Sequence, residues 1–261
     1  MAIKKGDFIE LEYTAKVKGE NIVFDTTDEK IAKEQQLHQE GASYGPVIIC
    51  VGEVQVLKGM DEALEGKEPG KAYTFDIIPE KGFGKKDAKL LRLIPTAKFR
   101  QQKIAPMPGL QVDIDGIMGI VKTVTGGRVI VDFNHPLSGR ELEYQVSIKR
   151  IVNDAKEQLQ AVFTMNGIKD AQISLEGQKA VVTLPIALPE KAVEPFKEGI
   201  LKMVKDLKAV EFIAKKDDEE SQEKTHAHHD HEKKPEPKRQ TPKPVQKTAT
   251  PIQKKPEPTS P

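Results

Sequence analysis

The fold of this chain is decided by residues 44–87, which read YGPVIICVGEVQVLKGMDEALEGKEPGKAYTFDIIPEKGFGKKD. Apolar runs separated by glycine and proline predict a buried strand over 46–51 and a short apolar helix over 57–64. A tight turn over 68–71 and a second strand over 72–78 follow. Phe83 follows on a glycine loop. This chain path allows Val56, Leu57, Met60 and Phe83 to line one concave apolar pocket.

The predicted pocket lacks the groups that make or break covalent bonds. The predicted pocket has no nucleophile, no metal-ligand cluster and no phosphate-binding loop. Catalysis in such a pocket would need shape and dryness instead. Rotation about an X–Pro peptide bond is a reaction of this kind, because its barrier of about 18–20 kcal/mol comes from amide resonance. A dry site disfavours the polar planar amide more than the twisted one.

The segments on either side of this stretch add further strands. Upstream, the apolar pattern predicts two strands and a helix with Asp28 as its N-cap, over 5–18, 22–25 and 28–40. Downstream it predicts three strands and one long alternating strand, over 111–115, 119–124, 128–133 and 142–152. Gly126-Gly127 is a strong hairpin signal between two of these strands. The intervening residues 100–108 are polar and contain proline.

The C-terminal third predicts a separate α-β-β-α-β unit. We expect a helix over 153–167 capped by Asn153 or Asp154, followed by strands over 171–175 and 180–184. An amphipathic helix over 189–207 and a last strand over 210–214 complete the unit. About sixty residues make a small core for a domain that stands alone. The unit therefore needs a partner surface, supplied by its neighbour or by a second copy in a homodimer.

Composition and charge exclude several classes of protein. The chain has 261 residues, which suggests two or three domains, and 41 basic against 40 acidic residues give no overall bias toward nucleic acid. Cys50 is the single cysteine, so an internal disulfide is excluded, and its apolar neighbours predict a buried, inert thiol. No run has the length of a signal peptide or a membrane span. We expect a cytoplasmic protein without membrane contact.

Residues 215–261 predict a disordered tail. They hold 8 of the 18 prolines and no aromatic residue, too little apolar surface to offset the entropy of ordering. Four imidazoles suit nickel, copper or zinc: His226, His228, His229 and His231. An incidental cluster is equally compatible with this pattern. The basic residues of 233–255 could contact RNA, the ribosome or an acidic membrane face, although a solvating tail is the simpler interpretation.

The pocket residues occur in the order and context of a known family. The chain resembles the FKBP-type peptidyl-prolyl cis-trans isomerases, and is most similar to their SlyD-like, long archaeal branch. The resemblance covers about residues 1–152. It rests on Tyr13, Phe24-Asp25, Val56-Leu57-Lys58-Gly59-Met60, Phe83-Gly84 and Tyr144, and on Asn134-His135-Pro136-Leu137-Ser138-Gly139 as the motif that re-enters the domain after an insert.

The resemblance implies an α+β fold of four parts. The first is an FKBP-like isomerase domain over 1–87 and 135–152, with an antiparallel sheet wrapped on a short helix. The second is an inserted β-rich chaperone domain (insert-in-flap) over 88–134. A C-terminal α-β-β-α-β domain over 153–214 and the tail over 215–261 follow. It implies that eight residues form the catalytic prolyl pocket: Tyr13, Phe24, Asp25, Val56, Leu57, Met60, Phe83 and Tyr144. No cofactor is required. Met60 stands where the family often has Trp, and Phe83 where it usually has Tyr.

The resulting hypothesis is a prolyl isomerase and folding chaperone that acts on unfolded or proline-containing chains. Its insert would hold these chains through apolar side chains such as Leu93, Ile104, Met107, Leu110 and Met118. Two rivals stay open. One is a non-enzymatic holdase that lost turnover through Met60 and Phe83, and the other is a metal-handling protein that uses the His tail. Taken singly, Val56 or Leu57 would be ordinary core, and Asp25 an ordinary turn residue.

Overall fold

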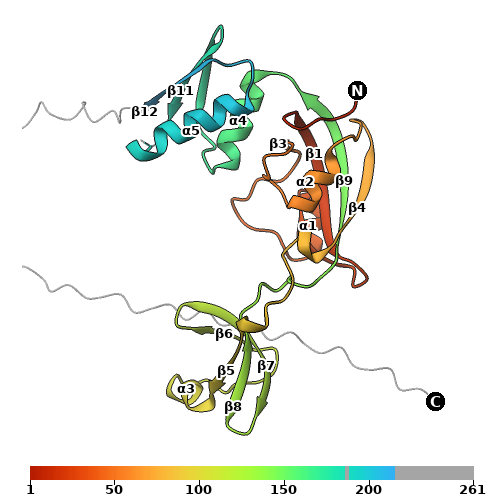
Figure 1. The fold of residues 1–261 in the computed structure, drawn as a ribbon, viewed down its shortest axis with the longest axis vertical. Coiled ribbons are helices and arrows are strands. Elements are labelled where there is room, and N and C mark those ends of the chain that lie inside the picture. Colours follow the sequence, from red (N-terminus) through yellow and green to blue (C-terminus); the bar gives the residue numbers. More distant parts are fainter. Residues whose placement is uncertain (186–187, 215–261) are drawn as a thin grey trace, which may run out of the picture. The chain divides into compact units, whose positions relative to one another are not determined.

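The alternating N-terminal segment forms the middle of the first of three sheets. The structure, a computed structural model, describes residues 1–185 and 188–214 (Figure 1), and these described residues belong to one compact unit. The first sheet is antiparallel, with strand order β2-β1-β9-β4, and β3 also pairs with β1. Its strands are β1 Phe8–Val17, β2 Ile22–Thr26, β3 Val47–Cys50, β4 Ala72–Ile77 and β9 Leu142–Val152.

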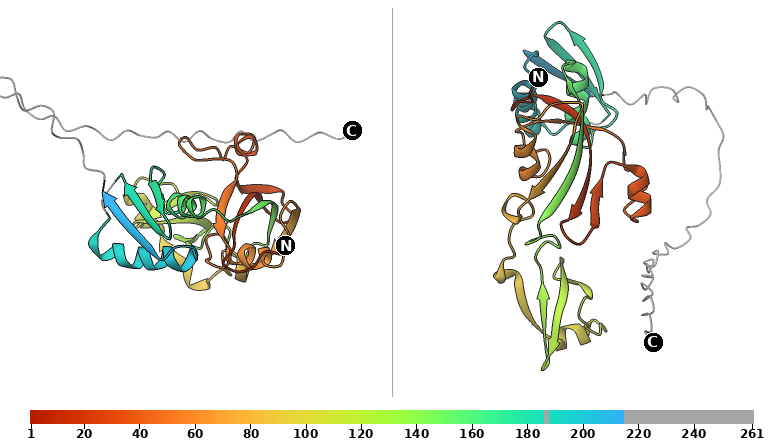
Figure 2. Two further views of the ribbon diagram at one scale, coloured as in Figure 1. Left: turned by 90° about the horizontal axis from the view of Figure 1, so that it is seen from above. Right: turned by 90° about the vertical axis from the view of Figure 1, so that its right-hand side faces the viewer.

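A short helix lies against one face of this sheet (Figure 1, Figure 2). This helix is α2 Lys58–Leu64, and its Met60 and Leu64 are fully buried among Leu11, Phe75 and other sheet residues. Gly59 permits the close approach, since a Cβ there would lie 2.6 Å from Ile77 Cγ2. The predicted antiparallel sheet wrapped on a short helix is confirmed.

The second sheet lies in the insert and has strand order β5-β8-β7-β6. Its elements are β5 Leu91–Pro95, α3 Thr96–Gln101, β6 Gln111–Ile114, β7 Ile117–Thr125 and β8 Arg128–Asp132. Gly126 and Gly127, with φ of 56° and 79°, form the predicted hairpin, since a two-residue turn of this type needs positive φ at both positions. Helix α3 was not predicted. It has one buried side chain, Phe99, so tertiary packing decides it.

The third sheet has strand order β10-β11-β12, with β12 parallel to β11, and α4 and α5 pack on it (Figure 1). Its elements are α4 Ala155–Met165, β10 Gln172–Glu176, β11 Lys179–Leu184, α5 Glu190–Met203 and β12 Ala209–Ala214. Their core also contains Phe8, Cys50 and Val152 of the first sheet's strands. The neighbouring domain thus supplies the partner surface that a sixty-residue unit requires. A homodimer through this unit stays a prediction.

Several predicted boundaries differ from the structure. Asp28 caps α1 Glu29–Glu34 as expected, but this helix ends well before residue 40. Helix α5 ends at Met203, and Val204 and Leu207 reach the core from the turn that follows. Asp154 is the cap of α4, because its side chain accepts a hydrogen bond from the Glu157 backbone N–H. The predictions for the tail, including its disorder, lie outside the described residues.

None of the helices within residues 1–185 and 188–214 has the length and apolarity that crossing a bilayer requires.

Two single-turn 3-10 helices, Pro79–Lys81 and Ala88–Leu90, flank the loop that carries Phe83.

Candidate active site

The predicted pocket exists as one cavity of about 720 Å³. All eight residues predicted for it line this cavity: Tyr13, Phe24, Asp25, Val56, Leu57, Met60, Phe83 and Tyr144. Six further residues complete its wall: Val54, Gln55, Lys58, Gly82, His135 and Leu137. Segments far apart in sequence meet here because β1, β2 and β9 are neighbours in the sheet and α2 packs against it.

Aromatic rings form much of the wall. The Tyr144 ring lies with its centroid 5.8 Å from that of Tyr13 and 6.0 Å from that of Phe24. Phe24 also meets Phe83 edge to face, with 6.0 Å between the centroids. Met60, a residue of α2, is fully buried. The cavity thus offers a rigid apolar surface to a ligand of the size of a proline ring.

One acid faces the cavity. Asp25 on β2 is exposed, and its Oδ2 accepts a hydrogen bond of 2.9 Å from the Tyr13 hydroxyl. Burial, and secondly the nearby negative charge of Asp25, raise the pKa of Tyr13 above its usual range. The Tyr13 proton is therefore held in place at neutral pH. The turn-forming interpretation of Asp25 alone does not explain this side-chain contact.

The loop that enters α2 is held by a buried carboxylate. Asp61 is 4% exposed, and its two oxygens accept hydrogen bonds from the backbone N–H groups of Gly52 (2.8 Å) and Val54 (3.1 Å). Val54 has φ of 54°, which a β-branched residue rarely adopts, and its side chain is 61% exposed beside the cavity. Asp61 thereby sets the position of the segment that carries Val56 and Leu57.

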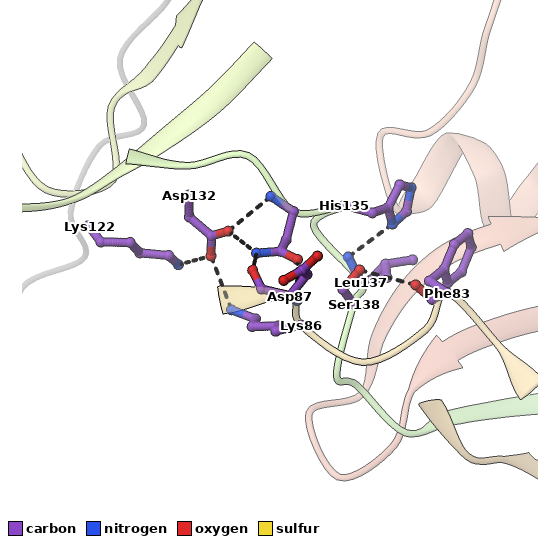
Figure 3. A network of polar contacts seen from close by, with 9 residues as sticks. Phe83, Lys86, Asp87, Lys122, Asp132, His135, Leu137 and Ser138 are labelled. Atoms are coloured by element: carbon purple, nitrogen blue, oxygen red, sulfur yellow. Dashed lines mark hydrogen bonds and ion pairs between the residues drawn. The ribbon is translucent and has the colours of Figure 1, made fainter. Parts of the chain in front are cut away.

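The opposite wall is formed by the Phe83 loop and the segment that follows the insert. Phe83 and His135 stack face to face, with 4.3 Å between ring centroids. His135 Nδ1 accepts a hydrogen bond from the Leu137 N–H, and Ser138 Oγ donates to the Phe83 carbonyl at 3.1 Å (Figure 3). The ring stacking and the Ser138 hydrogen bond hold the two segments together where the chain enters and leaves the insert.

The same junction contains a buried ion-pair network on its insert side. Asp132 is 5% exposed and lies 3.3 Å from Lys86 Nζ and 3.8 Å from Lys122 Nζ (Figure 3). Asn134 donates to Asp132, and it exchanges two hydrogen bonds with the Asp87 backbone. Although burial alone would raise the pKa of Asp132, hydrogen bonds from Asn134 and Lys86 lower it overall. The chain therefore leaves and re-enters the first domain at one braced point.

Sequence reasoning did not single out Val54, Leu137 or Asp61 as parts of the site. Val54 looks like an ordinary loop residue, and Leu137 was recognised only as part of the motif that re-enters the domain; the chain path brings both to the cavity. Asp61 carries a weak signal, since it is an acid in the first turn of an apolar helix. Within residues 1–185 and 188–214 no cluster of three or more His, Cys, Asp or Glu residues is placed to hold a metal, and the predicted imidazole cluster at His226, His228, His229 and His231 lies outside them.

The sheet, the helix packed across it and a cavity walled largely by apolar and aromatic side chains define an FKBP-like isomerase domain. Residues 1–100 match the family described as FKBP-type peptidyl-prolyl cis-trans isomerase, and residues 92–137 match the FKBP26 IF domain. A short-type peptidyl-prolyl cis-trans isomerase of Methanocaldococcus jannaschii is 35% identical over 149 residues, which are 57% of this chain and 94% of the relative.

Two bacterial relatives give the same assignment. A probable FKBP-type 16 kDa peptidyl-prolyl cis-trans isomerase of Pseudomonas fluorescens is 32% identical over 108 residues, 40% of this chain and 71% of that protein. The FKBP-type isomerase SlyD of Haemophilus influenzae is 25% identical over 131 residues, 49% of this chain and 69% of that protein. The chain belongs to the FKBP-type peptidyl-prolyl cis-trans isomerase family. It is an enzyme that catalyses rotation about X–Pro peptide bonds.

Rotation about a peptide bond moves no atom or electron between molecules, so the reaction itself requires no cofactor. The planar amide places negative charge on oxygen and positive charge on nitrogen, and twisting removes part of this separation. A dry apolar cavity therefore destabilises the planar form relative to the twisted one. X–Pro bonds are suitable substrates because both isomers are populated and exchange slowly without a catalyst.

Proposed function

We propose that this enzyme isomerises prolyl bonds of unfolded protein chains in the cavity while its insert holds those chains. The observation that carries the holding role is an exposed apolar face on the second sheet. Leu91, Leu93 and Met118 are 44%, 52% and 52% exposed there. The opposite face of the sheet packs on the insert's own core.

The strand register separates the two faces. Val121, Val129 and Val131 are fully buried and lie on the inner face. Leu93 pairs with Ile130, which alternates with these valines, and therefore lies on the outer face. Met118 lies one position from Gly119, where a Cβ would lie 2.6 Å from the inner-face Val131. Met118 therefore also points outward.

The predicted binding residues divide between these environments. Leu93, Met107 and Met118 are more than half exposed, as substrate-binding side chains need to be. Ile104 and Leu110 instead pack on the buried cluster around Phe99, so they stabilise the insert. An exposed surface of leucine and methionine adapts to varied apolar segments. Holding a chain there raises the effective concentration of its prolines near a site in the same molecule.

In the cavity we propose a role for each predicted residue. Val56, Leu57 and Met60 keep water from the twisting bond, and Tyr13, Phe24 and Phe83 form walls for the proline ring. Asp25, with one oxygen engaged by the Tyr13 hydroxyl, orients the neighbouring polar groups of the bound chain. Tyr144 completes the wall, where its ring contacts those of Tyr13 and Phe24.

Deletion of residues 88–132 tests the division of labour. The deletion ends lie close together, because the Asp87 N–H donates to Asn134 Oδ1 at 2.8 Å, so a short linker can close the gap. We expect the variant to isomerise prolyl tetrapeptides within about twofold of the full chain, since all lining residues remain. Proline-limited refolding of a protein substrate should slow by about tenfold or more, because the local concentration of substrate is lost.

A second variant keeps the insert folded. Leu93→Ser with Met118→Ser removes two outer-face side chains, and Thr123→Ser provides a matched change on an outer strand position opposite Ile130. The double variant should reproduce most of the refolding defect, and the control should not. Equal refolding rates for the full chain, the deletion and the double variant would refute the holding role, while leaving the isomerase activity on peptides intact.

A further inference from the structure

The hydroxyl of Tyr144 is a polar group in the cavity with no partner among the described residues. The side chain belongs to β9, and the residue is 4% exposed. The other tyrosine of the cavity, Tyr13, donates a hydrogen bond to Asp25, but no hydrogen bond to the Tyr144 oxygen is found within residues 1–185 and 188–214. A polar group in such a place requires an explanation, because buried polar groups are almost always paired.

The Tyr144 oxygen opens into the cavity instead of being sealed in the core. Among the described residues, Thr96 Oγ1 is the one side-chain oxygen or nitrogen that is fully enclosed without a partner. The Tyr144 residue is nevertheless buried, and it lines the cavity. A ligand in the cavity can therefore reach the oxygen, while the ring packs against those of Tyr13 and Phe24.

The hydroxyl is a permanent donor. Burial, and secondly the charge of Asp25, raise the pKa of Tyr144 above its usual range, so the oxygen keeps its proton at neutral pH. It does not act as a general acid, because it does not give the proton away. What it can supply is a hydrogen bond in a surrounding of low polarity, where such bonds are stronger than in water.

An acceptor for this bond arises during the reaction. The nitrogen of a planar prolyl amide is a poor acceptor, since its lone pair is delocalised into the carbonyl. As the bond twists, the lone pair localises on nitrogen and becomes able to accept. We propose that the Tyr144 hydroxyl donates a hydrogen bond to the prolyl nitrogen of the bound chain as its peptide bond twists, which makes Tyr144 a catalytic residue. The inference rests on the proposed use of this cavity as the prolyl site.

Tyr144→Phe is the direct test, because it removes the oxygen and keeps the ring. Loss of a hydrogen bond that forms only in the twisted state should lower kcat by about tenfold, which corresponds to about 1.4 kcal/mol, and should leave KM unchanged. Stability against urea should not fall, since the lost hydroxyl has no partner in the folded chain. Unchanged kcat, or a change confined to KM, would overturn the inference.

Tyr73→Phe is the matched control on the neighbouring strand β4. The Tyr73 oxygen accepts a hydrogen bond of 3.0 Å from the Glu68 N–H, and Tyr73 does not line the cavity. This variant should keep kcat and lose stability, the reverse of the result for Tyr144→Phe. If Tyr144→Phe instead loses stability as Tyr73→Phe does and kcat falls with it, the hydroxyl has a structural role and the proposal is wrong.

A titration separates failure of the inference from failure of the site assignment. Prolyl tetrapeptide should shift the methyl resonance of Met60, which lines the cavity, in both the wild-type chain and the Tyr144→Phe variant. If the resonance shifts in both and kcat is equal, the inference alone fails. If an active wild-type chain shows no shift, the cavity is not the prolyl site, and the proposed residue roles fail together with the inference.

Discussion

Asp61→Asn should both destabilise the chain and impair its cavity. The carboxylate uses one oxygen for the Gly52 N–H and the other for the Val54 N–H. An asparagine keeps the size of the side chain but replaces one oxygen by an amide NH2, which cannot accept. One charge-assisted hydrogen bond is lost, and a backbone N–H then faces another donor.

The magnitude follows from these contacts. A hydrogen bond to a charged group contributes about 1.5–3 kcal/mol, and Asp61 is almost completely buried, so solvent cannot replace it. We therefore expect unfolding to become easier by about 2–3 kcal/mol, equivalent to a fall in Tm of about 5–10 °C for a unit of this size. Because the released loop carries Val54 and Val56 beside the cavity, kcat/KM should fall by about tenfold.

Urea unfolding and the tetrapeptide assay measure the two effects. Glu62→Gln is the control, because this carboxylate on the same helix is exposed and paired with Lys81, an ion pair of little expected value. Val54→Gly relieves the backbone strain at φ of 54° and should recover about 1 kcal/mol of the loss in the double variant. Equal stability of Asp61→Asn and Glu62→Gln would refute the role given to Asp61.

Two further predictions concern ionisation. Burial, and then the charges of Glu53 and Asp61, raise the pKa of the Cys50 thiol to about 11. The folded chain should therefore resist alkylation at pH 8, and denaturant should expose the thiol to the reagent. Rapid alkylation without denaturant would contradict this prediction. The folded chain also holds the protons of Tyr13 and Tyr144 more tightly than the unfolded chain does, so stability is complete below the ordinary tyrosine pKa of about 10 and falls above it. Ionisation of each phenol should lower the free energy of unfolding by about 1 kcal/mol at pH 11, as measured by urea unfolding. Between pH 9 and pH 11 the Tyr144→Phe variant should lose less stability than the wild-type chain does. An equal loss of stability would contradict the assignment.

Local patterns were sufficient for most strands and for the helix caps. Alternation predicted β1 and β9, whose inward positions meet the core, and the Gly126-Gly127 turn predicted the hairpin in the insert. Asp28 was recognisable as a cap, and Asp154 was one of two candidates with Asn153, because a side-chain oxygen before a helix can accept from free backbone N–H groups. Helix α3 was missed, since its six residues lack a helical stripe and one buried ring, Phe99, holds them.

The site also contains features that the sequence predicted and features that only the structure revealed. Order and context were sufficient to place all eight predicted residues around one cavity. They could not show that Asp61 holds the loop from within, because that role depends on two hydrogen bonds that form only once the loop folds over α2. The free hydroxyl of Tyr144 was equally invisible. Whether a tyrosine is paired depends on what surrounds its oxygen in space.

The amino-acid sequence by itself determined the strands and the turn chemistry, because these follow from local periodicity and from backbone preferences of single residues. The full set of side chains predicted for the cavity came from the resemblance to the FKBP family. Tertiary structure alone decided which polar groups in and around the cavity found partners. Asp25 was paired with Tyr13, Asp132 with Lys86 and Asn134, and Tyr144 was left without a partner among the described residues. Hydrogen bonds act over about 3 Å and depend on direction, so they are set by the packing of distant strands, which no local pattern specifies.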